Sequence, residues 1–216
     1  MSTATMILGE SGTGKSASLR NLDPTQTLLI QTVKKPLPFK STDWKPATKD
    51  GGSVYVCDNS AKIVEAIKRT TKPVIVVDDF QYLLANEFMR RSDERGYDKF
   101  TDIARHAWDV LMQANEQADW KRVYILCHTT ADESGRIRAK TIGKMLDEKI
   151  TIEGLLTIVL RTTVINGQFM FRTVNSGSDT VKSPMGLFEA EMVENDLKEV
   201  DDAITQFYNL TLPKAA

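Results

Sequence analysis

The chain has 216 residues, of which 41% are hydrophobic and 26% charged, and its formal net charge is -1. This length suits one α/β domain over residues 1–216, and the composition excludes disordered and fibrous classes. The near-neutral charge excludes a protein that coats nucleic acid with its whole surface, so contact with nucleic acid would need a local basic patch. With two cysteines, no basic leader and no long apolar run, the sequence predicts a cytoplasmic protein without membrane contact.

Apolar runs alternate with helical patterns along the chain, which predicts a mainly parallel sheet flanked by helices. The first half is expected to form a strand at 4–8, a helix at 15–22, strands at 27–32 and 54–57, a helix at 60–70 and a strand at 74–77. The second half is expected to form a helix at 97–118, a strand at 123–127, a hairpin of 152–161 with 168–173, and a helix at 194–208. The stretches 34–52 and 176–186 are expected to be loops.

The first strand leads directly into a glycine-rich loop with the spacing GxxxxGK[ST]. Glycines let the backbone curl so that successive N–H groups point at phosphates, and the positive end of the following helix adds to this. Lys15 would reach the outer phosphates, and the Ser16 hydroxyl would bind Mg²⁺. The sequence therefore predicts ATP and Mg²⁺ as ligands, with nucleotide-binding residues Gly9, Glu10, Ser11, Gly12, Thr13, Gly14, Lys15 and Ser16.

Two adjacent carboxylates, Asp78 and Asp79, follow the buried strand at 74–77. Asp78 is expected to emerge beside the phosphate loop and to hold Mg²⁺ through its water shell. Asp79 is the candidate for polarising the attacking water, with Glu10 as the other carboxylate in range, but Asp79 could instead cap the next helix. His128, which follows the next buried strand, is either a sensor of the γ-phosphate or a structural histidine.

Several segments occur in an order that resembles the phage-encoded RecA-like ATPases of the Sak single-strand annealing group. They are the phosphate loop, Lys35-Pro36-Leu37-Pro38-Phe39, Val77-Asp78-Asp79, Cys127-His128-Thr129, Thr141-Ile142-Gly143-Lys144 and Asp179-Thr180-Val181-Lys182-Ser183-Pro184. The resemblance covers nearly the whole chain. It implies a RecA-like P-loop core, ATP hydrolysis, single-stranded DNA binding and a role in strand annealing or recombination. It also implies a homo-oligomer, in a ring or filament, and often a single-strand-binding protein as partner.

Two loops reach DNA in RecA-like folds, and the resemblance places them at about 86–98 and 130–145. Clustered cations in both segments suit a groove that follows a phosphate backbone. Interleaved acidic residues leave the alternative of a solvated face of mixed charge. The candidate DNA-binding residues are Arg90, Arg91 and Arg95 in the first loop, and Arg136, Arg138, Lys140 and Lys144 in the second.

RecA-like ATPases also place a cation from a neighbouring protomer at the γ-phosphate. The resemblance assigns this role to Lys182, with Arg161 and Arg172 as alternatives. One departure concerns the base: RecA proteins carry a glutamate at the end of the second strand, whereas this strand ends Gln31-Thr32-Val33-Lys34. The expected base therefore moves to Asp79, and we expect hydrolysis to be slow and DNA-stimulated.

Three other functions are compatible with the same loop. A replication accessory such as a phage helicase loader would use ATP as a switch, and the Asp78-Asp79 pair favours its chemistry, although such proteins usually carry a helical lid domain. A small-molecule kinase is disfavoured because no compact arginine-rich lid is evident. A non-hydrolysing nucleotide-binding scaffold is favoured by the missing carboxylate on the second strand.

Overall fold

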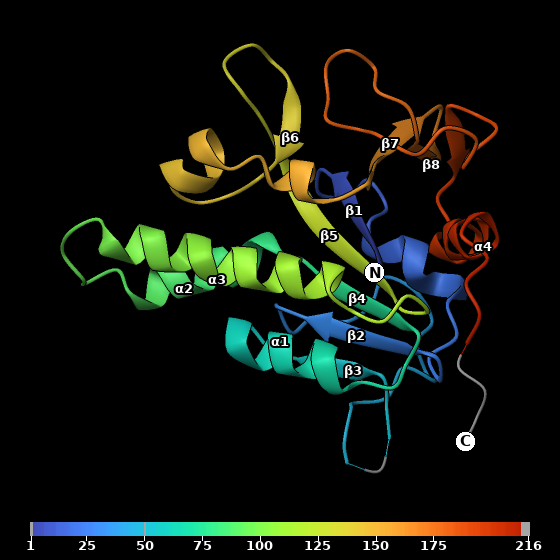
Figure 1. Ribbon diagram of the computed structural model, residues 1–216, viewed down its shortest axis with the longest axis horizontal. Helices are drawn as coiled ribbons and strands as arrows, with labels where there is room; N and C mark the ends of the chain where they lie inside the picture. The colour runs from blue at the N-terminus through green and yellow to red at the C-terminus, as the bar shows by residue number, and fades with distance from the viewer. Residues whose placement is uncertain (1, 50, 213–216) are drawn as a thin grey trace.

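A single twisted sheet runs through the molecule and carries helices on both faces (Figure 1). The computed structural model describes residues 2–49 and 51–212. The sheet has nine strands, in the order β3-β2-β4-β5-β1-β7-β8-β9, with β6 paired to β5 outside this row. The strands from β3 to β7 in this order pair in parallel, while β8 and β9 add an antiparallel edge. The predicted α/β class with a mainly parallel sheet is confirmed.

The elements have the following bounds. The strands are β1 (Thr3–Gly9), β2 (Thr27–Gln31), β3 (Val54–Val56), β4 (Val74–Asp78), β5 (Arg122–Ala131), β6 (Ile137–Ala139), β7 (Ile158–Ile165), β8 (Gln168–Arg172) and β9 (Met192–Glu194). The α-helices are α1 (Ser60–Arg69), α2 (Gln81–Arg90), α3 (Asp98–Asn115) and α4 (Leu197–Phe207). Short 3-10 helices are η1 (Ser16–Asn21) and η3 (Ile152–Leu155), and η2 (Met145–Lys149) is a short π-helix.

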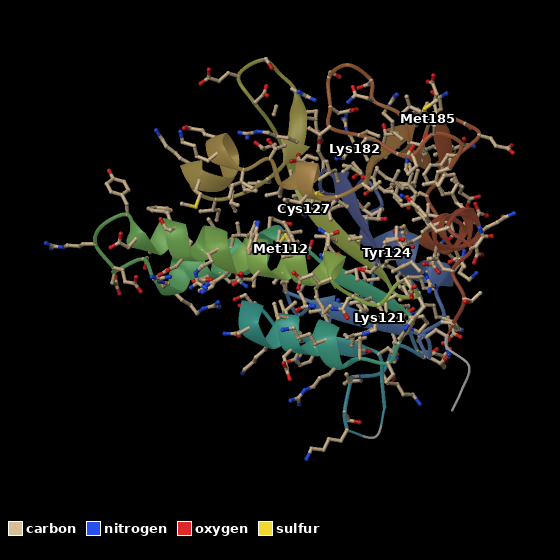
Figure 2. The ribbon with its side chains drawn as sticks, viewed as in Figure 1. Met112, Lys121, Tyr124, Cys127, Lys182 and Met185 are labelled. Atoms are coloured by element: carbon tan, nitrogen blue, oxygen red, sulfur yellow. The ribbon has the colours of Figure 1, made fainter. Side chains whose placement is uncertain are left out.

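The central strands are apolar on both faces because each face is covered by helices, as is usual for parallel sheets. Helices α1, α2 and α3 cover one face, and α4 with η1 covers the other. Strand β5 shows the alternation: Tyr124 belongs to the apolar cluster on the face of α4, and Cys127 belongs to the cluster on the face of α1, α2 and α3 (both are labelled in Figure 2). No described helix combines the length and apolar character that crossing a bilayer requires.

The observed elements differ from the predicted ones, which did not include β6, η2 or β9. The expected helix at 15–22 is the 3-10 helix η1, which stops before Pro24. The first strand of the hairpin begins at Ile158, because 152–155 form η3. The terminal helix starts at Leu197, where Asp196 caps it by accepting a hydrogen bond from the N–H of Lys198. Strand β5 continues to Ala131 because β6 supplies it with a pairing partner.

Candidate phosphate-binding site

The phosphate loop connects β1 to η1 at the carboxyl edge of the parallel strands. Gly14 has a φ of 99°, a backbone conformation that side chains with a Cβ disfavour. The helix that follows has only six residues and is of the 3-10 type. The contribution that a helix dipole could make to anion binding is therefore small.

The start of the loop packs closely against β7. A Cβ on Gly9 would lie 1.9 Å from Thr162 Oγ1 and 2.8 Å from Thr13 Oγ1. These two hydroxyls lie 2.6 Å apart, and Thr162 Oγ1 also donates to the carbonyl of Leu8 at 3.2 Å. Thr162 therefore fixes both the end of β1 and the curl of the loop, a role that the sequence did not indicate.

Gly9→Ala is expected to lower the free energy of unfolding by about 1–3 kcal/mol, the usual range for overpacking a close-packed site. Combining it with Thr162→Ala should recover part of this loss, since the clash with the hydroxyl disappears. Urea denaturation of both variants and of Thr162→Ala alone measures the effect. Equal stability of Gly9→Ala and the parent protein would contradict this packing.

Lys15 and Ser16 occupy the positions that the motif predicts. The Lys15 side chain is buried, and its Nζ donates to the carbonyls of Gly9 and Glu10, both at 2.7 Å. Burial lowers the pKa of Lys15. Ser16 Oγ donates to both carboxylate oxygens of Asp78, at 3.0 and 2.9 Å. The fold thus brings together the hydroxyl and the carboxylate that were predicted to hold Mg²⁺.

These two side chains fit a magnesium site. Mg²⁺ prefers hard oxygen ligands and usually keeps several waters, taking only one or two protein groups together with substrate phosphates. Asp78 is only 1% exposed, and this burial, together with the charge of Asp79, raises its pKa to about 6.

Asp79 lies at the centre of a small polar cluster beneath the loop. Its Oδ2 forms an ion pair with Lys35 Nζ, and its Oδ1 lies 3.5 Å from His128 Nε2. Burial by itself raises the pKa of Asp79, but the bonds to His128 and Lys35 outweigh it and hold the pKa below its ordinary value. Asp79 is therefore an anion at neutral pH.

The backbone at Asp79 is held in an unusual conformation. Its φ is 60°, which is strained for a residue with a side chain. Thr32 Oγ1 supports it by donating to the carbonyls of Asp78 and Asp79, at 3.1 and 2.7 Å. The capping alternative is wrong: Phe80 is the N-cap residue of α2 and its side chain makes no capping bond, while the Asp79 carboxylate faces Lys35 and His128.

A cavity of about 300 Å³ lies over these groups and joins the loop to Asp79 and His128. Glu10 is not in its lining; this side chain is exposed, which makes it a poor candidate for the base. An adjoining cavity of about 610 Å³ shares Ala17 and Phe169 and continues towards Arg20 and Asn195. The first cavity is lined by Ser11, Gly12, Gly14, Lys15, Ser16, Ala17, Lys35, Pro38, Asp79, His128 and Phe169.

Lys35 and Thr32 are the main site residues that the sequence did not reveal. Both follow β2, at the strand end where the absence of a carboxylate was noted. Lys35 belongs to a segment that contributed to the resemblance, but nothing in the sequence pairs it with Asp79. The sequence did offer one indication: Lys35 is a cation just after β2, the strand that pairs with β4 and its terminal Asp78.

The two predicted DNA-binding loops differ in how far their cations are neutralised. Arg90 pairs with Asp58 at 2.6 Å. Arg91 pairs with Glu87, Glu94 and Asp102 at 3.2, 2.8 and 3.0 Å, whereas Arg95 is exposed.

The cations of the second loop are mostly exposed. Arg136, Lys140 and Lys144 are exposed, Arg138 is half-buried, and Lys144 lies 4.0 Å from Glu148. Figure 1 shows the β5–β6 connection and the following segment apart from the tip of the α2–α3 hairpin. Arg136, Lys140 and Lys144 are therefore accessible to a polyanion, although Arg136 Nε also donates to the carbonyl of Asp179 at 3.2 Å.

The three residues proposed to reach the γ-phosphate of a neighbouring protomer lie in or near β7 and β8. A guanidinium nitrogen of Arg161 lies 3.5 Å from the buried Oδ2 of Asp179. Arg161 is directly opposite Arg172 in the antiparallel pairing of β7 and β8. Lys182, labelled in Figure 2, is half-buried, and its backbone exchanges hydrogen bonds with that of Val159 at 2.9 and 2.8 Å. None of the three lines the phosphate cavity of its own chain.

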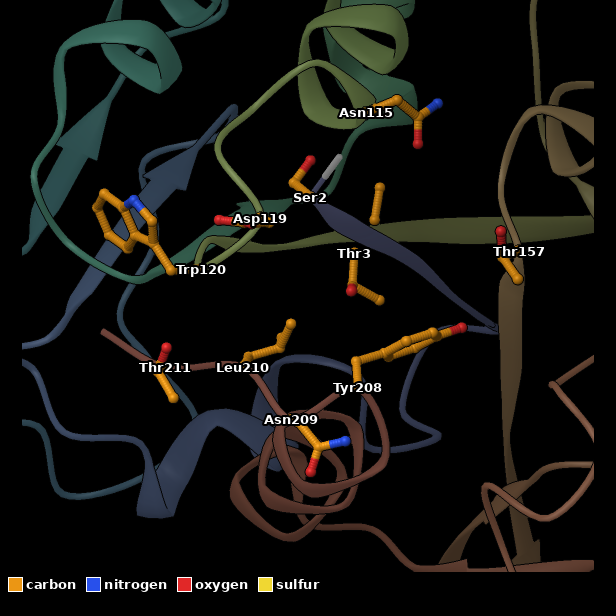
Figure 3. A pocket seen from close by; sticks show the side chains of 11 residues that line it. Ser2, Thr3, Asn115, Asp119, Trp120, Thr157, Tyr208, Asn209, Leu210 and Thr211 are labelled. Atoms are coloured by element: carbon orange, nitrogen blue, oxygen red, sulfur yellow. The ribbon is translucent and has the colours of Figure 1, made fainter. Parts of the chain in front are cut away.

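A separate cavity of about 410 Å³ lies at the opposite end of β1 (Figure 3). Its walls include Thr3, where β1 begins, and Trp120 and Tyr208. The phosphate loop follows Gly9 at the other end of the same strand. This cavity is therefore not part of the site.

The chain is thus an α/β domain that carries a loop of the spacing GxxxxGK[ST] at the carboxyl edge of its parallel strands. No family model matches the chain, and no curated protein matches it. A solved structure with similarity is that of the genome packaging NTPase B204 from Sulfolobus turreted icosahedral virus 2 in complex with ATP-gammaS. It is 11% identical, the match covers 82% of this chain and 78% of that chain, and the TM-score is 0.40. A likeness this distant carries no inference about what this chain binds.

Proposed function

We propose that the chain is a RecA-like ATPase that binds ATP with Mg²⁺ and hydrolyses it. The observation that carries the proposal is the bond from the Ser16 hydroxyl to the Asp78 carboxylate, directly beside a complete phosphate loop. Loop, hydroxyl and buried carboxylate are the parts that phosphoryl-transfer sites of this class require.

Each side chain of the site would have a separate role in binding or hydrolysis. Lys15 would exchange the carbonyls of Gly9 and Glu10 for the outer phosphates, and Ser16 and Asp78 would hold Mg²⁺. The bound ion would neutralise charge on the phosphate oxygens. Asp79, an anion at neutral pH, would accept a proton from the attacking water. His128, beside Asp79, would contact the γ-phosphate.

The adjoining cavity suits the rest of the nucleotide. It adjoins the phosphate cavity at Ala17 and Phe169, and Phe169 is 46% exposed. An accessible aromatic ring beside a phosphate site can stack on a nucleobase. This arrangement supports a complete nucleotide, rather than an isolated phosphate, as the ligand.

Phosphate release from Mg-ATP, measured with and without single-stranded DNA, tests the proposal and separates its rivals. Hydrolysis that DNA accelerates supports a recombination or annealing ATPase. Transfer of phosphate to a small molecule would reveal a kinase. Nucleotide binding without turnover under either condition would reject the ATPase and leave the scaffold. Turnover that only a replicative helicase stimulates would indicate a loader.

We also propose single-stranded DNA as the partner, with strand annealing or recombination in phage replication as the role. The resemblance to the Sak group suggests it, and the exposed cations Arg136, Lys140 and Lys144 support it. The same resemblance supports a ring or filament of identical chains in the host cytoplasm, working beside a single-strand-binding protein. In such an assembly Lys182, Arg161 or Arg172 would reach the γ-phosphate of a neighbour.

Replacing Arg136, Lys140 and Lys144 together by Glu is expected to remove most DNA binding and to spare ATP affinity. Each lost contact with a single-stranded phosphate lowers the log–log salt slope by about 0.7, so the slope should fall by about 2. Fluorescence anisotropy with a labelled oligonucleotide across a salt series measures both quantities.

The control for this variant carries the same change of charge elsewhere on the surface. Lys45, Lys62 and Lys68 are exposed and lie outside both loops, and their joint replacement by Glu should leave most binding in place. Equal loss in the two triple variants would show only a general effect of charge. Binding by the loop variant at the parent level would reject the second loop as the DNA site.

A further inference from the structure

We propose that Lys35 is a second cation for the γ-phosphate, supplied by the same chain that binds the nucleotide. In the nucleotide-free protein it pairs with Asp79, and when ATP binds it moves to the γ-phosphate and leaves Asp79 free to act on water. The inference rests on the proposed ATP site and assigns a role to a residue that neither the motif nor the resemblance explains.

The position of Lys35 supports direct contact with a nucleotide. Its side chain lines the same cavity as Lys15 and His128, and its Nζ pairs with Asp79. The Asp79 side chain is only 4% exposed, whereas that of Lys35 is 40% exposed. Both side chains line the cavity, and Lys35 is the more accessible member of the ion pair.

The surroundings of Lys35 allow its ammonium group to move while its backbone stays in place. Gln31 Nε2 donates to the Lys35 carbonyl at 3.2 Å, and Pro36 follows directly in the chain. The lysine side chain is a flexible four-carbon stem with a mobile charge. A triphosphate carries more negative charge than one carboxylate, so bound ATP competes with Asp79 for the ammonium group.

The exchange changes what Asp79 can do. Before ATP binds, Oδ2 of Asp79 is engaged by Lys35 and Oδ1 faces His128. After Lys35 leaves, Oδ2 can accept a proton of a water molecule. The water oxygen then bonds to the γ-phosphorus and the bond to the bridging oxygen breaks, giving ADP and inorganic phosphate. Lys35 would stabilise the charge that develops on the γ-phosphate oxygens.

If the cation at the γ-phosphate comes from the same chain, ATP hydrolysis no longer requires assembly into an oligomer. Lys182, Arg161 and Arg172 do not line the phosphate cavity of their own chain, so each would act only across an interface. Lys35 already lies in the cavity. Hydrolysis that depends on Lys35 therefore needs no second protomer to complete the charge at the γ-phosphate.

Binding of ATPγS and ADP to Lys35→Met, measured by calorimetry with Mg²⁺, tests the contact. Loss of one charge-assisted contact should weaken ATPγS binding at least about tenfold. ADP affinity should stay within about twofold of the parent, because ADP lacks the γ-phosphate. Lys34→Met is the matched control, since Lys34 is the exposed neighbour, and it should leave both affinities unchanged.

Comparing the effects of Lys35→Met on ATPγS affinity and on ADP affinity distinguishes direct contact with the γ-phosphate from a structural role of Lys35. A purely structural role would weaken both nucleotides alike, and that result would overturn the proposal. Lys35→Arg should recover part of the ATPγS affinity because it keeps the positive charge. An unchanged ATPγS affinity in Lys35→Met would also overturn it. Failure of the parent to bind ATPγS would instead reject the proposed ATP site, and Lys35 with it.

Mixing experiments test whether the cation acts within one chain. Lys35→Met should hydrolyse ATP at least about a hundredfold more slowly than the parent, as expected for losing a charge that stabilises the transition state. Mixing it with Lys15→Ala, which keeps Lys35 but lacks the phosphate lysine, should restore no activity. Recovered activity would show that Lys35 acts across an interface and would overturn the proposal.

Discussion

Lys15→Ala is expected to abolish ATP hydrolysis, lowering the rate by about a thousandfold or more, the scale reported for losing a transition-state cation in this class of reaction. The reason is positional. The ammonium group is buried under the loop and is held only 2.7 Å from the carbonyls of Gly9 and Glu10, so it is close to where the outer phosphates would lie. Phosphate release under saturating Mg-ATP measures the loss.

The same variant should fold normally. Burial lowers the pKa of Lys15 in the folded chain, which means that folding disfavours its charged form. Removing the charge should therefore leave the melting temperature unchanged or slightly raised, as thermal denaturation followed by circular dichroism would show. A Lys15→Ala protein that hydrolyses ATP at the parent rate would reject the P-loop site altogether.

Asp78→Asn and Asp79→Asn are expected to fail in different ways. Asp78 contacts Ser16, so its loss should remove the Mg²⁺-dependent part of ATP binding. Asp79 contacts Lys35 and His128, so its loss should spare binding and slow hydrolysis by about a hundredfold, as for loss of a general base. Calorimetry and phosphate release on both variants separate the two roles. Equal loss of binding in both variants would contradict this division.

The pH dependence sharpens the test for Asp78. Its pKa is raised to about 6 by burial and by Asp79, and only the anion can hold Mg²⁺. The Mg²⁺-dependent affinity of the parent should therefore fall as pH drops below about 6, whereas Asp78→Asn should show no such step. A parent affinity that is flat across this range would contradict the role of Asp78.

Protonation of Asp78 has opposite effects on Mg²⁺-dependent affinity, which it lowers, and on folding stability, which it raises. With a folded pKa above its ordinary value, the folded chain binds more protons at Asp78 than the unfolded chain does. Stability of the nucleotide-free protein therefore increases as pH falls through about 6 towards the ordinary value of 3.8. The Asn variant should lack this contribution.

The parts of the site that the sequence predicted are those encoded locally. The phosphate loop is one continuous segment, and Asp78 could be placed because carboxyl ends of parallel strands meet at one edge of the sheet. Thr162, Thr32 and Lys35 act through contacts between distant segments, which depend on strand order and side-chain direction. No local pattern carries that information.

The same reason explains the differences in the basic loops and the short elements. Arg91 looked available for DNA in the sequence, but Glu87 and Asp102 from two different helices converge on it. The short 3-10 helix after Lys15 and the strand β9 depend on the packing of α4 and β8 rather than on periodicity. Periodicity was most reliable for long elements such as α3.

The tight packing of the phosphate loop against late segments of the chain affects the order in which the protein becomes competent during synthesis. The loop is synthesised well before its packing partners: Thr13 bonds to Thr162, and a Cβ on Gly14 would lie 2.9 Å from Asn195 Oδ1. Strand β1 can pair in the sheet only after β5 and β7, its two neighbours, have been synthesised. Such distant pairings form late because the intervening chain must be closed first. A nascent chain therefore carries the loop sequence before the loop can take its folded shape, and termination before β7 would release a product with the motif but without the residues that hold the loop in place.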